Sequence, residues 1–242
     1  MLNVSLIEYT AKPQNVVAMA AKLCYSGKNM QDLKEEVDSK DAGKFVEMLR
    51  EIGHESPLEH VSFTFRVEGI SRACLAQLTR HRIASFNVQS QRYVGKEDFL
   101  FVMPPSIERD EEAKEVFLKA MQASNEAYKN LTKILKQKSS VADEKAKEKS
   151  AIEDARYVLP NACETRLMVT MNARELLHFF ELRCCNRAQW EIRGLAFCML
   201  KLVKKVAPQI FKSAGPRCVR DSCKEGKMSC GQMAKMREIY NF

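Results

Sequence analysis

Hydrophobic residues recur along this chain with two spacings, one typical of strands and one typical of helices. Between residues 60 and 68, valine and phenylalanine alternate with polar residues, which predicts a strand with one buried face. Residues 3–10 and 165–171 are also predicted as strands. The stretch 28–41 is polar and is predicted as loop or frayed helix.

Helical spacing of apolar residues covers much of the remaining chain. Ser71 and Asn172 are suitable N-caps, and Gly53 is a suitable helix stop. The predicted order of elements indicates an α/β or α+β fold, with a central, mainly antiparallel sheet and long helices packed on it. The predicted helices are 13–24, 43–52, 71–81, 107–138, 141–158, 172–184, 188–206 and 232–240.

Length and composition limit the classes of protein that this chain can represent. With 242 residues, 45% of them hydrophobic, it can bury a substantial core. No Gly/Ser/Pro-rich linker divides it, so we expect one domain over residues 1–210 and a Cys-rich tail over 211–242. We expect a cytoplasmic protein, because there is no export signal and no apolar run near the roughly 20 residues that span a bilayer. Nine cysteines without an export signal favour reduced thiols.

The net charge of +8 suits an anionic partner, which composition leaves open as a nucleotide, a phosphorylated cofactor or a nucleic acid. A nucleic-acid-binding protein is one alternative, but its aromatic residues would be interleaved with the basic ones, and here they are not. A solvated basic surface accounts for many of the lysines.

The densest chemical signal is Arg80-His81-Arg82, followed by Ser90 and Arg92. Gln77 precedes Arg80 by three residues, so both lie on one helical face. One guanidinium group can bind two phosphate oxygens at once, and the amide of Gln77 can both donate and accept. The group therefore suits a phosphorylated ligand that carries a polar ring. The alternative is a basic helix end that stabilises its last carbonyls.

Two further groups combine histidine with charged residues. His54, Glu55, Glu59 and His60 lie between a helix and a strand, at a spacing that matches no common zinc motif. The other group lies mainly around the helix after Asn172, where Asn172 can be an N-cap, a ligand contact or both. Its members are Arg156, Asn172, Arg174, His178, Arg183 and Arg187.

The chain lacks two common nucleotide-binding motifs. It has no Gly-x-Gly-x-x-Gly and no Gly-x-x-x-x-Gly-Lys-Ser/Thr, so neither a Rossmann turn nor a P-loop is indicated. Any nucleotide must be held in another way.

The segment RHRIASFNVQSQRY resembles the signature of the flavin-dependent thymidylate synthases. The likeness continues through GHESPLEH, DARYVLP, VTMNARELLHFFELR and AQWEIR, in the same order, over about residues 44 to 205. The resemblance implies a fold of the thymidylate-synthase-complementing type and a homotetramer with active sites at subunit interfaces. It implies reductive methylation of dUMP to dTMP with FAD, NADPH and 5,10-methylenetetrahydrofolate, without a nucleic-acid or membrane partner.

The resemblance also implies the site residues by their positions. Arg183 matches the arginine that favours ionisation at N3 of the uracil, so electrostatic stabilisation replaces a protein nucleophile. The residues implied at FAD are His54, Ser56, Glu59, Arg80, His81, Arg82, Val88, Asn172, Arg174 and His178. Those implied at dUMP are Gln77, Arg80, Val88, Gln89, Ser90, Gln91, Arg92, Arg156 and Arg183.

Three positions depart from the family pattern. Val88 stands where many relatives carry Glu or Gln, which leaves a backbone contact. His178 occupies a position that is Asn in some members of the family, and Arg187 occupies a position that is His. A relative that binds its ligands without turnover is a further alternative, which the intact Arg183 disfavours.

The tail contains three cysteines in CVRDSCKEGKMSC. Cys218, Cys223 and Cys230 with a fourth ligand can hold a metal, and free thiols in a loop are the alternative. Because no Cys-x-x-Cys pair is present, the spacing favours free thiols and no metal.

Overall fold

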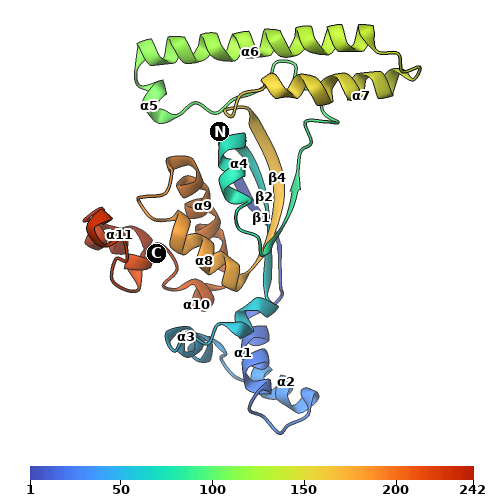
Figure 1. Ribbon diagram of the computed structural model, residues 1–242. Coiled ribbons are helices and arrows are strands. Elements are labelled where there is room, and N and C mark those ends of the chain that lie inside the picture. The colour runs from blue at the N-terminus through green and yellow to red at the C-terminus, as the bar shows by residue number, and fades with distance from the viewer. The chain divides into compact units, whose positions relative to one another are not determined.

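The computed structural model describes residues 1–242 and contains a four-stranded antiparallel sheet with eleven α-helices (Figure 1). The order of the strands in the sheet is β1-β2-β4-β3. The strands are β1 (Asn3–Tyr9), β2 (Ser62–Ser71), β3 (Ala84–Val88) and β4 (Glu164–Asn172). The mixed α/β class and the antiparallel sheet predicted from the sequence are confirmed.

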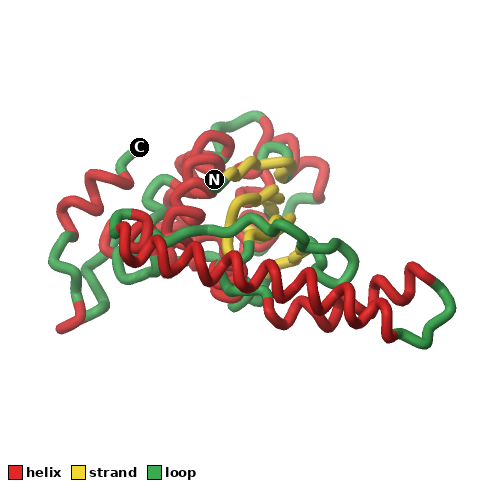
Figure 2. The backbone as a smooth tube through the Cα atoms, turned by 90° about the horizontal axis from the view of Figure 1, so that it is seen from above, coloured by secondary structure: helices red, strands yellow, loops and turns green.

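Helices make up most of the chain, as the colours of Figure 2 show. None of them is both long and apolar enough to cross a membrane. The α-helices are α1 (Pro13–Leu23), α2 (Met30–Asp38), α3 (Gly43–Glu51), α4 (Arg72–Leu78), α5 (Pro105–Glu108), α6 (Glu111–Lys138), α7 (Glu144–Ala155), α8 (Ala173–Arg183), α9 (Trp190–Val206), α10 (Pro208–Phe211) and α11 (Met233–Tyr240). Short 3-10 helices cover Ser56–His60, Arg156–Val158, Arg217–Val219 and Gly226–Met228.

The chain divides into two compact units, and the boundary between them falls inside each of the four strands. The first unit comprises residues 1–3, 68–76 and 87–167. The second comprises residues 4–67, 77–86 and 168–242, so the tail from residue 211 belongs to it.

The first unit is built around the long helix α6 and its partner α7, which lie side by side (Figures 1 and 2). Asp110 begins α6 by accepting a hydrogen bond from the backbone N–H of Ala113 (3.0 Å). The fully buried Tyr128 of α6 packs with Ile152 and Ala155 of α7. This apolar contact holds the two helices together.

The core of the second unit lies between its part of strand β2 and helices α8 and α10. The Phe63 ring of β2 meets the ring of Phe211, with centroids 5.4 Å apart, and Phe211 in turn meets Phe180 at 6.0 Å. All three rings are fully buried, as the predicted alternation along β2 requires for its inward face. This core anchors α8, which carries several of the predicted site residues.

Two segments differ from the sequence prediction. Residues 30–38 form helix α2, because Asn29 caps it by accepting from the N–H of Asp32 (3.0 Å) and two of its side chains, Leu33 and Val37, are buried. Strand β3 is absent from the prediction, which interprets its segment as a polar stretch, although Ala84, Phe86 and Val88 alternate with polar residues there. It forms beside β4, which supplies the pairing partner that local sequence does not reveal.

Candidate active site

Two buried polar side chains and a half-buried arginine connect helix α8 to the segment that follows α4, within the second unit. His81 is only 5% exposed, and its Nδ1 lies 2.9 Å from Oε1 of Glu175. On the other side of the ring, Nε of Arg183 donates to Nε2 of His81 (3.1 Å). Glu175 and Arg183 stand at the two ends of α8, so the histidine connects the ends of one helix.

These contacts determine the protonation of His81. An arginine Nε always carries a hydrogen, so Nε2 of His81 must be the unprotonated acceptor and Nδ1 must donate to the Glu175 carboxylate. Burial lowers the pKa of His81; Glu175 opposes that shift and Arg183 adds to it. His81 is therefore neutral at pH 7, and its ring holds the Arg183 side chain in one orientation.

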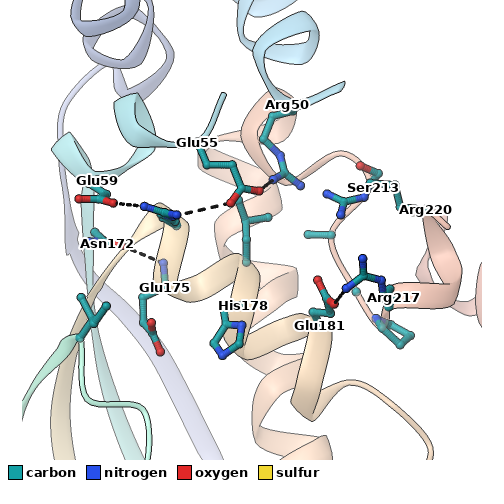
Figure 3. Close-up of a pocket in the computed structure, with 16 residues that line it drawn as sticks. Arg50, Glu55, Glu59, Asn172, Glu175, His178, Glu181, Ser213, Arg217 and Arg220 are labelled. Carbon is teal, nitrogen blue, oxygen red and sulfur yellow. Dashed lines mark hydrogen bonds and ion pairs between the residues drawn. The ribbon is translucent and has the colours of Figure 1, made fainter. Parts of the chain in front are cut away.

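A cavity of about 480 Å³ opens beside α8, within the second unit (Figure 3). Its volume lies in the range of small-molecule sites. Four of its lining residues, Glu59, Asn172, Arg174 and His178, are among those predicted at FAD. Helix α8 and the 3-10 helix of residues 56–60 thus bring together side chains that lie more than one hundred positions apart in the sequence.

Asn172 and Arg174 have structural partners in this cavity. Asn172 caps α8 by accepting from the N–H of Glu175 (2.8 Å), which confirms the predicted cap. Arg174 donates from Nη1 to Glu59, and its Nε lies 3.7 Å from Glu55. The pair with Glu59 raises the pKa of Arg174, so the guanidinium stays charged at the cavity wall.

Other residues predicted at FAD do not line this cavity. His54 is half-buried and follows Gly53, whose positive φ of 75° ends α3 as predicted. The side chains of Ser56, Arg80 and Arg82 are exposed, whereas His81 lies beneath the surface. Val88, which is half-buried, belongs to the first unit.

In the first unit, two arginines predicted at dUMP contact the same residue. Nε of Arg92 lies 2.6 Å from the Glu153 carboxylate, and Nε of Arg156 donates to the Glu153 carbonyl oxygen (3.0 Å). Ser90 Oγ accepts from the N–H of Arg92 (3.1 Å). The fold therefore gathers an arginine pair and a hydroxyl, which together suit a phosphate group.

The neighbouring amides are held by side chains of the same unit. Gln89 accepts from Nζ of Lys96 (2.7 Å), and Gln91 donates to the sulfur of Cys163 (3.7 Å). The remaining residues predicted at dUMP, namely Gln77, Arg80 and Arg183, belong to the second unit.

Most of the chain matches a known protein family, and the matched part contains all the residues predicted at FAD and dUMP. The family described as thymidylate synthase complementing protein matches residues 5–209. The chain belongs to this family.

Relatives named flavin-dependent thymidylate synthase match the chain almost from end to end. The chain is 53% identical to that of Clostridium tetani over 241 residues, which is 99% of this chain and 97% of the relative. It is 47% identical to that of Geobacter sulfurreducens, over 99% and 98% of the two chains. It is 40% identical to that of Pyrococcus furiosus, over 91% and 88%.

Several residues of the site escape prediction from the sequence. From the sequence, Glu175 is recognisable only as part of a helix start. Its position beside the apolar Leu176 and Leu177 is the one signal that its carboxylate is buried and needs a polar partner. Arg50 and Glu153 carry no local signal. Ser213, Arg217 and Arg220 line the cavity from the tail, outside the range that the family model matches.

The tail cysteines do not form a metal site in this structure. None of the nine cysteines of the chain forms a disulfide bond, and no group of three or more His, Cys, Asp or Glu side chains is placed to hold a metal ion. Cys218 is buried, where burial raises the pKa of its thiol, whereas Cys230 is exposed and accepts from Asn186 (3.7 Å).

Proposed function

We propose that this member of the thymidylate synthase complementing protein family converts dUMP to dTMP. The reaction takes a one-carbon unit from 5,10-methylenetetrahydrofolate and a hydride from FAD that NADPH has reduced. One observation carries the proposal: two enzymes of this name match the chain over 97% and 98% of their own length.

The lining of the cavity in the second unit supports binding of part of a flavin nucleotide there. The cavity is polar and is lined by four guanidinium groups, which are suited to phosphate oxygens, and by four glutamates. Nε of Arg217 is buried there without a hydrogen-bond partner, which a ligand atom would satisfy. Bound FAD would supply the hydride that completes the methyl group.

Arg183 is the proposed catalytic residue. A guanidinium at N3 of the uracil stabilises the negative charge that develops on the ring, and so makes C5 more nucleophilic. The contact with His81 supports this role, because the buried ring fixes the direction of the Arg183 side chain. No side chain of the protein then has to attack the uracil.

The remaining residues of the dUMP site are assigned by position. Arg92, Arg156 and Ser90 would bind the phosphate, and Gln89 and Gln91 would contact the nucleoside. Val88 would contact dUMP through its backbone, and Gln77 and Arg80 would form the other wall of the dUMP site. His54, Ser56, Glu59, Arg80, His81, Arg82, Asn172, Arg174 and His178 would serve FAD, the buried His81 through its neighbours.

The protein would act in the cytoplasm as a homotetramer, with each active site formed by more than one subunit. A domain over residues 1–210 would carry these sites, followed by the tail of residues 211–242.

Anaerobic conversion of dUMP to dTMP by the purified protein tests the function. We expect dTMP only when FAD, NADPH and methylenetetrahydrofolate are all present, and each is omitted in turn as a control. Flavin binding without dTMP would point to another substrate, and absence of flavin binding would contradict the proposal.

The variant Arg183→Ala tests the catalytic assignment. We expect kcat to fall by about 10²- to 10³-fold, the usual loss when one preorganised charge donor is removed. The matched control is Arg109→Ala, which removes an exposed arginine of the first unit and should leave kcat unchanged. An Arg183→Ala enzyme with full kcat would remove Arg183 from the mechanism.

A further inference from the structure

Two arginines from distant parts of the chain line the cavity, and each donates a single hydrogen bond to a carboxylate. Arg50 of α3 is only 8% exposed, and Arg220 follows the 3-10 helix of residues 217–219 in the tail. Figure 3 shows both extending into the cavity, which Ser213 also lines. All three residues belong to the second unit.

Each arginine uses only a small part of its hydrogen-bonding capacity. Arg50 donates one long bond, from Nη1 to Glu55 (3.3 Å), and Arg220 donates one, from Nε to Asp221 (3.2 Å). The other N–H groups of both side chains donate to no protein atom. Arg50 is buried, and a buried guanidinium with unused donors is costly unless an anion accepts from it.

Arg50 also lies near the positive charge of Arg220. Burial lowers its pKa, and the neighbouring Arg220 lowers it further, against the opposing effects of Glu55 and Glu181. The carboxylates nearby are already engaged, since Glu181 pairs with Arg217 (2.6 Å) and Glu55 also faces Arg174 (3.7 Å). Glu55 and Asp221, the acidic partners of Arg50 and Arg220, are thus each shared with a second arginine.

We propose that Arg50, Arg220 and Ser213 form a phosphate-binding subsite for an adenine dinucleotide, at the part of the cavity away from Asn172. This subsite rests on the proposed function and extends it to residues of the tail. A phosphate has enough acceptor oxygens for two guanidinium forks and a hydroxyl, whereas a carboxylate has only two oxygens. Ser213 and Arg220 lie beyond residue 209, where the match to the family model ends.

The subsite has two candidate sources of the phosphate. One is the pyrophosphate of FAD, and the other is a phosphate of NADPH, including the 2′-phosphate that NADH lacks. Both present the same chemistry to the arginines, so the experiment must separate them.

The test compares the wild-type enzyme with Arg220→Ala and Arg220→Lys, each as the full chain. Arg220 is suitable because its side chain is 37% exposed, so the substitution leaves the core intact. The matched control is Lys212→Ala, which removes a nearby positive charge that pairs with Glu47 and does not line this cavity. Flavin fluorescence gives the Kd of FAD, and kinetics at saturating FAD give KM for NADPH, NADH and methylenetetrahydrofolate.

We expect Arg220→Ala to weaken binding about tenfold, with partial recovery in Arg220→Lys. A higher Kd for FAD identifies the flavin pyrophosphate. A higher KM for NADPH identifies the reductant, and an unchanged KM for NADH then identifies its 2′-phosphate.

Three outcomes would overturn the subsite: no change in either cofactor, a change only in KM for methylenetetrahydrofolate, or an equal change in Lys212→Ala. These outcomes count against the subsite only when the wild-type enzyme forms dTMP under the same conditions. A wild-type enzyme that forms no dTMP contradicts the proposed function itself, which is a separate result.

Discussion

Glu175 acts on Arg183 through the ring of His81. Its carboxylate accepts from Nδ1 of His81, which leaves Nε2 to accept from Arg183. The ring of Phe179 packs edge-on against His81 at 5.0 Å, and His178 faces it at 5.9 Å. Glu175 is therefore a positioning residue, whose removal should change the orientation of a charge and the titration of a histidine.

We expect Glu175→Gln to lower kcat about tenfold, equal to about 1.4 kcal/mol in the barrier, with little change in KM for dUMP. Protonated His81 has N–H groups on both nitrogens and cannot accept from Arg183, so activity should fall as pH drops through the pKa of His81. Glu175 raises that pKa, and its loss must lower it. The acid limb of the kcat profile should consequently move to lower pH in Glu175→Gln.

The control for this variant is Glu126→Gln, an exposed carboxylate of α6 whose side chain accepts from Gln122 (3.0 Å). Its pH profile should match that of the wild type. An acid limb that stays in place in Glu175→Gln, with a lower melting temperature alone, would reduce Glu175 to a structural residue.

Among the elements, helix α8 both packs against the core of the second unit and lines its cavity. Asn172 ends strand β4 and begins α8, and the buried side chains of Leu176 and Phe180 hold the helix against the core. The same helix presents Arg174 and His178 to the cavity. One side-chain cap therefore supports both the packing and the orientation of the cavity wall.

Asn172→Ala should reduce the free energy of unfolding by about 1 kcal/mol, because the hydrogen bond to the N–H of Glu175 is lost. Urea denaturation measures this change. Asn172→Asp is the matched control for the cap, since aspartate accepts the same hydrogen bond and should retain the stability. Its added negative charge should nevertheless weaken FAD binding; unchanged FAD binding in both variants would remove Asn172 from the flavin site.

Across the whole molecule, the proposed dUMP residues occur in both compact units. Arg92 and Arg156 lie in the first unit and Arg183 in the second. In a homotetramer with shared sites, one subunit would supply Arg156 and another would supply Arg183.

Co-expression of Arg156→Ala and Arg183→Ala chains tests this arrangement. Each variant alone should have little activity. Random mixing should restore about a quarter of the wild-type activity if two subunits build each site, because that share of sites receives both intact arginines. No recovery in mixed tetramers would mean that a single chain supplies both residues.

Local patterns along the chain predict most of the elements and their caps. The alternation in β2, the stop at Gly53 and the cap at Asn172 depend on residues close together in the sequence, and all three are confirmed. The motif around Arg80-His81-Arg82 likewise indicates the family from one contiguous segment, and the match over residues 5–209 confirms that family.

Which of these residues meet depends on the tertiary structure. Strand β3 pairs with β4, although α5, α6 and α7 separate the two strands in the sequence. His81 and Glu175 lie 94 positions apart, and no local pattern records their contact. Arg50 and Arg220 come from α3 and from the tail, and they meet only because both segments pack around the same cavity. The physical reason is that periodicity and capping act within a few residues, whereas the burial and charge of a site depend on which distant segments share it.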